Sequence, residues 1–181
     1  MSGALSHVTK RAAELRLAFD RTFAEPVRLD TTLKEDLLAI RVGTQACAMR
    51  VSEIAGLFAD RKITPVPGGH AALRGIAGFR GAIVPVYDLQ ILLGHSSSET
   101  LRWLVIAAAA PVALAFAGFD GQLRVSRDAI VPEPSRPGIR GYARELVRTE
   151  NFVGPVVSLA SVLDLIKTER SEAAPKSQEE Q

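Results

Sequence analysis

Side chains able to perform acid–base, nucleophilic or metal chemistry are few in this sequence and far apart. The three histidines, His7, His70 and His95, have no cysteine, serine or carboxylate at a spacing typical of a catalytic triad or a metal site. Asp88 and Asp164 fall at or within short predicted helices, where helix capping or solvent exposure explains them. The pattern therefore predicts no catalytic residue and no metal ligand. A dispersed catalytic site stays open as an alternative, because triads are assembled in space.

Cofactor chemistry is also missing from the sequence pattern. The chain has one cysteine, Cys47, which cannot form an internal disulfide and lies in a short apolar run. A buried small hydrophobe is the favoured interpretation of this thiol. The glycines between Gly68 and Gly81 are too irregularly placed for a dinucleotide fingerprint or a phosphate-binding P-loop. We therefore predict no cofactor.

Basic residues give the case for a nucleic-acid partner. Arginines recur at every fourth position and would share one face of a strand or of a helix, at Arg136, Arg140, Arg144 and Arg148. A nucleic-acid surface also needs interleaved aromatic residues and a basic excess. One aromatic residue, Tyr142, lies among these arginines, and the formal net charge is +2. The solvated face of a hairpin is favoured, and a β-barrel nucleic-acid-binding module stays open as an alternative.

Composition indicates a domain with an aliphatic core. The 181 residues are enough for one domain or two small fused barrels, and 47% of them are hydrophobic but 6% aromatic. The apolar stretch 103–119 is interrupted by Pro111 and is slightly short for a membrane-spanning helix, which favours two buried strands. Residues 1–25 mix both charge signs and lack the apolar core of a signal peptide. We expect a cytoplasmic protein without direct membrane insertion.

Residues 1–25 are predicted to form an amphipathic helix ahead of the main domain. Apolar residues recur three or four positions apart, at Leu5, Val8, Ala12, Leu15 and Phe19. Pro26 ends the pattern, and residues 26–36 are predicted to be a linker. Packing onto the domain and docking onto a partner both fit this helix, and the sequence leaves the choice open.

From Leu37 the pattern changes to short strands bounded by glycine, proline and polar residues. The predicted strands span 37–42, 45–49, 83–87, 101–109, 112–117, 122–125, 129–131, 139–148 and 152–158. A short helix over 158–166 follows, and residues 167–181 are predicted to be a disordered tail. Many short strands with few helices predict a mainly β fold made of small barrels.

Several local features of this fold are predicted in more detail. Gly43-Thr44 is expected to turn the first hairpin, and residues 51–58 are interpreted as one or two helical turns. Pro85 predicts an edge or irregular position for its strand, because proline cannot donate a hydrogen bond to a neighbouring strand. Asp88 is expected to cap a short helix that Gly94 ends.

Residues 51–94 carry a series of motifs in a specific order. They read Val51-Ser52-Glu53-Ile54, Ile63-Thr64-Pro65-Val66-Pro67-Gly68, Leu73-Arg74-Gly75-Ile76, Phe79-Arg80-Gly81 and Ile83-Val84-Pro85-Val86-Tyr87-Asp88-Leu89. This series resembles the CheW family of chemotaxis coupling proteins, whose members carry V-x-E-[IV], T-P-[LIV]-P, L-R-G and [IV]-[IV]-P-V-x-D-L segments. The resemblance spans about residues 37–166, and residues 101–166 match mainly by their strand pattern.

The resemblance implies two five-stranded SH3-like barrels around a shared apolar interior, and it implies no catalysis. It further implies an adaptor that couples the cytoplasmic tip of a chemoreceptor to the regulatory domain of the chemotaxis histidine kinase. The receptor-binding residues that carry over are Val51, Glu53 and Arg80. Glu53 is expected to pair with Arg80 or with a charge of the receptor. An internal ion pair that only fixes the turn is the alternative for these two residues.

Three departures from the family pattern bear on the partners. Gly78-Phe79 replaces the usual Asn-Leu before the arginine of the turn, and Ala117-Gly118 and Val157-Ser158 stand where the family places an aspartate. The second half of the domain contributes kinase-binding surface in the family. An accessory protein that binds the receptor but not the kinase is therefore a second alternative.

Overall fold

The computed structural model describes residues 33–67, 70–96, 100–132 and 142–172. All the described residues belong to one compact unit, Leu33–Gln181. The predicted helix over 1–25, most of the linker and the loop with Arg136 and Arg140 lie outside the described residues. Strand β1 begins at Lys34, so the last residues of the predicted linker form strand.

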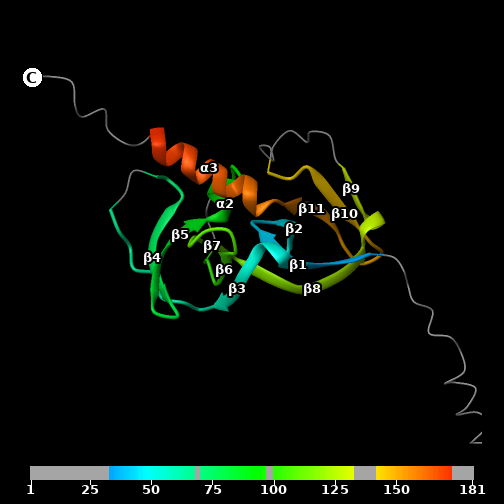
Figure 1. The fold of residues 1–181 in the computed structure, drawn as a ribbon, viewed down its shortest axis with the longest axis horizontal. Coiled ribbons are helices and arrows are strands. Elements are labelled where there is room, and N and C mark those ends of the chain that lie inside the picture. The colour runs from blue at the N-terminus through cyan, green and yellow to red at the C-terminus, as the bar shows by residue number, and fades with distance from the viewer. Residues whose placement is uncertain (1–32, 68–69, 97–99, 133–141, 173–181) are drawn as a thin grey trace, which may run out of the picture. The chain divides into compact units, whose positions relative to one another are not determined.

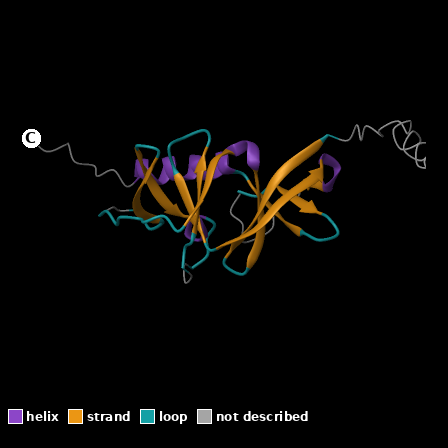
Figure 2. Cartoon of the chain, turned by 90° about the horizontal axis from the view of Figure 1, so that it is seen from below, coloured by secondary structure: helices purple, strands orange, loops and turns teal. Residues whose placement is uncertain are grey.

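The described strands form two sheets, which Figure 2 shows as two groups of orange arrows. The first sheet has six strands in the order β8 (Gly118–Ser126), β1 (Lys34–Val42), β2 (Gln45–Arg50), β11 (Val153–Val157), β10 (Glu145–Arg148) and β9 (Ile130–Pro132). The second has five, in the order β3 (Ile54–Ala59), β6 (Trp103–Ala107), β7 (Ala113–Phe116), β5 (Ala82–Asp88) and β4 (Leu73–Phe79). The mainly β prediction is confirmed, but the first sheet has a sixth strand because the short β9 pairs with β10.

The two sheets are built from different parts of the chain (Figure 1). The five strands of the second sheet come from one continuous stretch, 54–116. The first sheet takes β1 and β2 from before that stretch and its other four strands from after it. Its closing contact is the parallel pair of β11 with β2, in which Val156 lies opposite Ala48.

The predicted turns and caps are confirmed at two places. Gly43 has a φ of 62° in the β1–β2 hairpin, and Val42 pairs with Gln45 across the turn. The Asp88 carboxylate accepts a hydrogen bond from the Gln90 amide at 2.8 Å, which starts helix α2 (Leu89–Leu92). Gly94 follows that helix with a φ of 86°.

Two local predictions are correct only in part. Residues 51–58 begin with a single short 3-10 turn, η1 (Val51–Glu53), but strand β3 starts at Ile54, because pairing with β6 outweighs the helical pattern. Strand β5 lies between β7 and β4, so Pro85 is not on an edge strand. Pro85 is tolerated there because it pairs with β4 alone, and the pairing with β7 begins one residue later, at Val86.

The segment with the T-P-V-P motif covers part of the outer edge of β4. Thr64 and Ile76 exchange two backbone hydrogen bonds of 2.8 and 2.9 Å. Gly75 is required at this contact because its φ is 141° and a Cβ atom there would lie 2.1 Å from the Thr64 carbonyl oxygen. The motif glycine thus serves a close approach between two backbone segments.

The apolar stretch 103–119 forms the β6–β7 hairpin and the start of β8, as the two-strand interpretation predicted. No helix among the described residues has the length and apolar character needed to cross a membrane. A second short 3-10 element, η2 (Arg127–Ala129), joins β8 to β9.

Helix α3 (Leu159–Glu172) closes the main core cluster. Its buried side chains, Leu159, Val162 and Ile166, pack with residues of β1, β2, β5, β6 and β7. Because burying one such side chain contributes about 1.5–3 kcal/mol, this apolar face is the main reason that the helix docks. The helix continues past the predicted end at Ile166 to Glu172.

Candidate protein-binding site

Arg80 stands at the tip of the β4–β5 hairpin in a strained backbone conformation. Its φ is 47°, in the left-handed region that favours glycine, and Gly81 beside it has a φ of 84°. The side chain is exposed, and it forms no ion pair with any described residue. The turn therefore presents an exposed arginine side chain that has no ion pair among the described residues.

An apolar pocket opens beside this guanidinium. Its volume is about 420 Å³, and most of its lining is small or apolar: Ala55, Phe58, Phe79, Arg80, Ala82, Val84, Ile106, Ala107, Ala108, Ala109, Ala110 and Pro111. We call this set the Arg80 pocket. The alanines create the space, because a methyl group fills little of the volume between β3, β5 and the end of β6.

Two phenylalanine rings in contact with each other line one side of the Arg80 pocket. Phe58 and Phe79 lie with ring centroids 4.9 Å apart, and Phe79 is only 5% exposed. The guanidinium carbon of Arg61 lies 5.2 Å from the Phe58 ring centroid. Phe79, which departs from the family pattern, thus shapes the pocket and leaves Arg80 in place.

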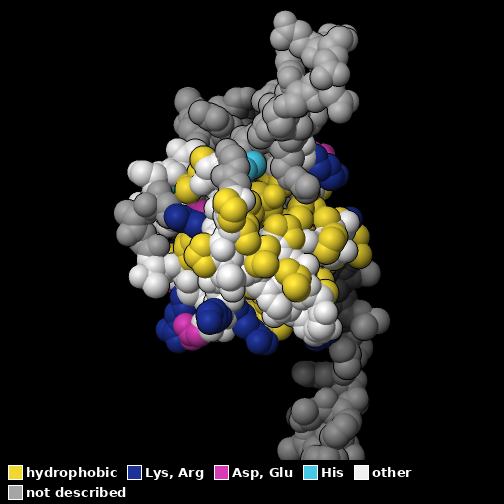
Figure 3. Space-filling view, turned by 90° about the vertical axis from the view of Figure 1, so that its left-hand side faces the viewer, with side chains coloured by type: hydrophobic (Ala, Val, Ile, Leu, Met, Phe, Trp, Pro, Cys, Tyr) yellow, Lys and Arg dark blue, Asp and Glu magenta, His cyan; other side chains and the backbone are white. Residues whose placement is uncertain are grey.

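One face of the described domain is broadly apolar. Figure 3 shows a wide hydrophobic patch on the face where β4 and β5 lie, with Lys and Arg side chains along its lower edge. Ile83, just after the hairpin tip, is 72% exposed. An exposed apolar surface bordered by cations indicates a protein-binding face.

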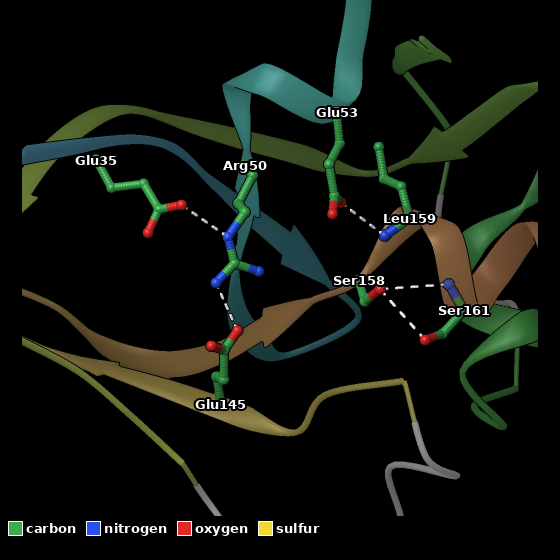
Figure 4. A network of polar contacts seen from close by, with 7 residues as sticks. All are labelled: Glu35, Arg50, Glu53, Glu145, Ser158, Leu159 and Ser161. Carbon is green, nitrogen blue, oxygen red and sulfur yellow. Dashed lines mark hydrogen bonds and ion pairs between the residues drawn. The ribbon is translucent and has the colours of Figure 1, made fainter. Parts of the chain in front are cut away.

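The backbone of Glu53 contacts a residue that lines this pocket, whereas its carboxylate contacts the start of helix α3. The Glu53 carbonyl oxygen accepts a hydrogen bond of 2.9 Å from the amide of Ala108, which lines the pocket. The Glu53 carboxylate accepts a hydrogen bond of 2.9 Å from the amide of Leu159, the first residue of α3. Figure 4 shows the side chain extending from η1 toward that helix. No ion pair joins Glu53 and Arg80, so the expected pairing between them is not present.

Val51 borders a different, more polar pocket. That pocket is lined by Leu33, Lys34, Glu35, Asp36, Val51, Ser52 and Arg127. Neither of these two pockets therefore gathers the three predicted receptor-binding residues. Arg80 lines the apolar pocket, Glu53 reaches its rim through the backbone, and Val51 lies at the other end of η1. Their role in receptor binding stays a prediction.

Ionic contacts that the sequence pattern did not reveal hold η1 and α2 in place. Arg50, directly before η1, contacts Glu35 at 2.9 Å and Glu145 at 2.5 Å, which joins β2 to β1 and β10 (Figure 4). Burial lowers the pKa of Arg50, but its hydrogen bonds with Glu145 and Glu35 raise it further, so the net shift is upward. Arg74 contacts the fully buried carboxylate of Asp88 at 2.6 Å. These pairings join distant strands, so spacing along the chain gives no signal for them.

Two further sequence expectations concern Cys47 and Ser158. Cys47 is 1% exposed, and burial raises the pKa of its thiol to about 12, so the prediction of a buried small hydrophobe is confirmed. Ser158 accepts a hydrogen bond of 3.3 Å from the Ser161 amide at the start of α3. Serine and aspartate both serve as N-caps, so the absence of the family's aspartate at Val157-Ser158 leaves this helix start intact.

Comparison with known proteins decides the family. The CheW-like domain model matches residues 36–167. The chain belongs to the CheW-like domain family. The "Chemotaxis protein CheW" of Rhizobium meliloti is 28% identical over 145 residues, which cover 77% of this chain and 92% of the relative. The protein of the same name from Thermotoga maritima is 32% identical over 90 residues, or 49% of this chain and 60% of the relative.

A solved structure agrees with this assignment at the level of the fold. The scaffolding protein TtCheW from Thermoanaerobacter tengcongensis has a TM-score of 0.63 and 16% sequence identity, covering 70% of this chain and 90% of that one. The CheW-like assignment confirms the predicted class, a non-enzymatic scaffold that couples chemoreceptors and kinase in chemotaxis.

Proposed function

We propose that this CheW-like protein acts in the cytoplasm and binds the cytoplasmic tip of a chemoreceptor at the Arg80 pocket. One observation carries the proposal: Arg80, which forms no ion pair with a described residue, lines an apolar pocket of about 420 Å³. Burying such a pocket yields affinity, and the cation at its mouth sets the orientation of the partner.

The chemistry of the Arg80 pocket specifies what the receptor must present. Alanines and two phenylalanine rings accept a large apolar side chain, whereas Arg80 and Arg61 at the border favour a neighbouring carboxylate. Arg80 needs little ordering, because its backbone turn is fixed on both sides by paired strands. Val51, at the far end of η1, is proposed as a peripheral contact of the same partner.

The regulatory domain of the chemotaxis histidine kinase is the second proposed partner, as in the family. Each sheet then corresponds to one SH3-like barrel of the adaptor, with β9 as an added strand of the first. The start of α3, where Ser158 replaces an aspartate, keeps its helix cap, and this supports a retained kinase-binding half. A protein that binds the receptor but not the kinase is a separate outcome of the experiment below.

The test is calorimetric titration of the full chain with a receptor tip fragment and, separately, with the kinase regulatory domain. We expect Arg80→Asp to abolish receptor binding, because it reverses the charge at the pocket mouth. Ala109→Leu should weaken binding about tenfold or more by filling the pocket. Arg124→Asp is the matched control, because Arg124 is an exposed arginine on β8 of the other sheet.

The outcomes separate the possibilities. Binding by the Arg80→Asp variant with wild-type affinity would show that the receptor uses another surface. Binding of the receptor fragment without binding of the kinase domain would identify the accessory type of protein. Loss of receptor binding in the Arg124→Asp control would show that charge alone, rather than the Arg80 pocket, governs the interaction.

A further inference from the structure

Glu53 joins three parts of the fold that lie far apart in the sequence. Its backbone ends η1, its carbonyl oxygen holds the amide of Ala108 after β6, and its carboxylate holds the amide of Leu159, 106 positions later in the chain. Both hydrogen bonds measure 2.9 Å. One residue thus contacts the rim of the Arg80 pocket on one side and the start of α3 on the other.

The carboxylate contact completes the cap of α3. The first amides of a helix have no partner within the helix, and among the described residues the Ser158 hydroxyl accepts from the amide and hydroxyl of Ser161 and not from Leu159. Leu159 is 1% exposed, so water does not readily reach its amide. The Glu53 carboxylate is the acceptor that this amide finds, and its negative charge also suits the positive end of the helix dipole.

We infer that Glu53 is a positioning residue, which couples the start of α3 to the rim of the Arg80 pocket instead of contacting the partner. This inference rests on the proposed function for its effect on binding, but the coupling itself is a property of the free protein. A receptor group that took the Oε2 oxygen would displace Leu159 from the carboxylate, and this would leave a buried amide without a partner.

Backbone amide hydrogen exchange, measured by NMR on the full chain, tests the coupling without any partner. We expect Glu53→Ala to speed exchange of the Leu159 amide about tenfold, and to speed exchange of the Ala108 amide as well. Glu53→Gln should protect both amides as in wild type, because the side-chain amide oxygen still accepts a hydrogen bond. Asp164→Ala is the control, because it removes an exposed carboxylate from the same helix.

A second variant perturbs α3 from a residue that is not part of the Arg80 pocket. Ser158→Ala removes the Oγ acceptor and should speed exchange at Leu159 and, through Glu53, at Ala108. The coupling is overturned if Ala108 exchange stays at the wild-type rate in both Glu53→Ala and Ser158→Ala. An unchanged Leu159 amide in Glu53→Ala would overturn the cap itself. Because the exchange rates are measured on the free protein, they test the coupling independently of whether the receptor binds at the Arg80 pocket.

Binding of the receptor tip fragment then separates positioning from contact. A positioning role predicts that Glu53→Ala weakens binding about tenfold, whereas Glu53→Gln stays within about threefold of wild type. Loss of binding in Glu53→Gln, with the Leu159 amide still protected, would show that the charge itself touches the partner. That result would reject the positioning role.

Discussion

Replacing Arg80 with glycine should separate binding from stability. The φ of 47° costs a non-glycine residue about 1–2 kcal/mol, and glycine removes this cost. Glycine also makes the unfolded chain more flexible, which costs about 0.4–1 kcal/mol. Arg80 is exposed and forms no ion pair with the described residues, so little other stabilisation is lost. The net change in the free energy of unfolding is therefore a gain between zero and about 1.5 kcal/mol.

This gain corresponds to a rise in Tm of up to about 6 °C for a domain of this size. Receptor binding should fall about tenfold or more, because the guanidinium at the pocket mouth is removed. Thermal unfolding followed by circular dichroism measures the first quantity and calorimetric titration the second. Arg80→Ala is the matched variant: it removes the same side chain but keeps the backbone cost, so it should be less stable than Arg80→Gly. A clear drop in Tm for Arg80→Gly would refute the claim that the strain at this turn serves binding.

Two further predictions concern buried groups outside the pocket. Gln90 is 1% exposed, and neither of its side-chain polar atoms has a hydrogen-bond partner among the described residues. Gln90→Leu should therefore raise the free energy of unfolding by about 1–3 kcal/mol in chemical denaturation, and an unchanged or lower value would indicate an internal water. The thiol of Cys47 has its pKa raised from 9.0 to about 12 by burial, so the stability that its protonated form contributes is complete below pH 9 and is lost as pH rises toward 12. Cys47→Ala should flatten that part of the stability profile, and equal slopes for the variant and the wild type would contradict the assignment.

The sequence was sufficient for features that depend on neighbouring residues. The Gly43-Thr44 turn and the Asp88 cap follow from local backbone chemistry, and the apolar runs on either side of Pro111 have the length of buried strands. The motif order likewise led to the correct family. The spacing of residues 54–58 also fits a helix, and only the distant partner β6 makes them a strand.

The candidate site was less accessible to sequence reasoning. Arg80 was identified by its motif, but the alanines from Ala107 to Ala110 look like an ordinary strand end until the fold places them opposite Phe58 and Phe79. The internal partner of the Glu53 carboxylate was hidden for a similar reason. The carboxylate meets an amide 106 positions away, and no spacing rule links the two. Contacts of this kind depend on tertiary structure alone.

The interrupted origin of the first sheet has a consequence for synthesis on the ribosome. The second sheet can assemble as soon as residue 116 has left the exit tunnel, because all five of its strands are then available. At that stage one edge of β2 has no partner strand. Its parallel neighbour β11, Val153–Val157, is synthesised about forty residues after the end of β7. A nascent chain stalled before that point would have a folded second sheet and a β2 strand whose apolar edge is exposed. Chaperones would have to shield this partly folded chain.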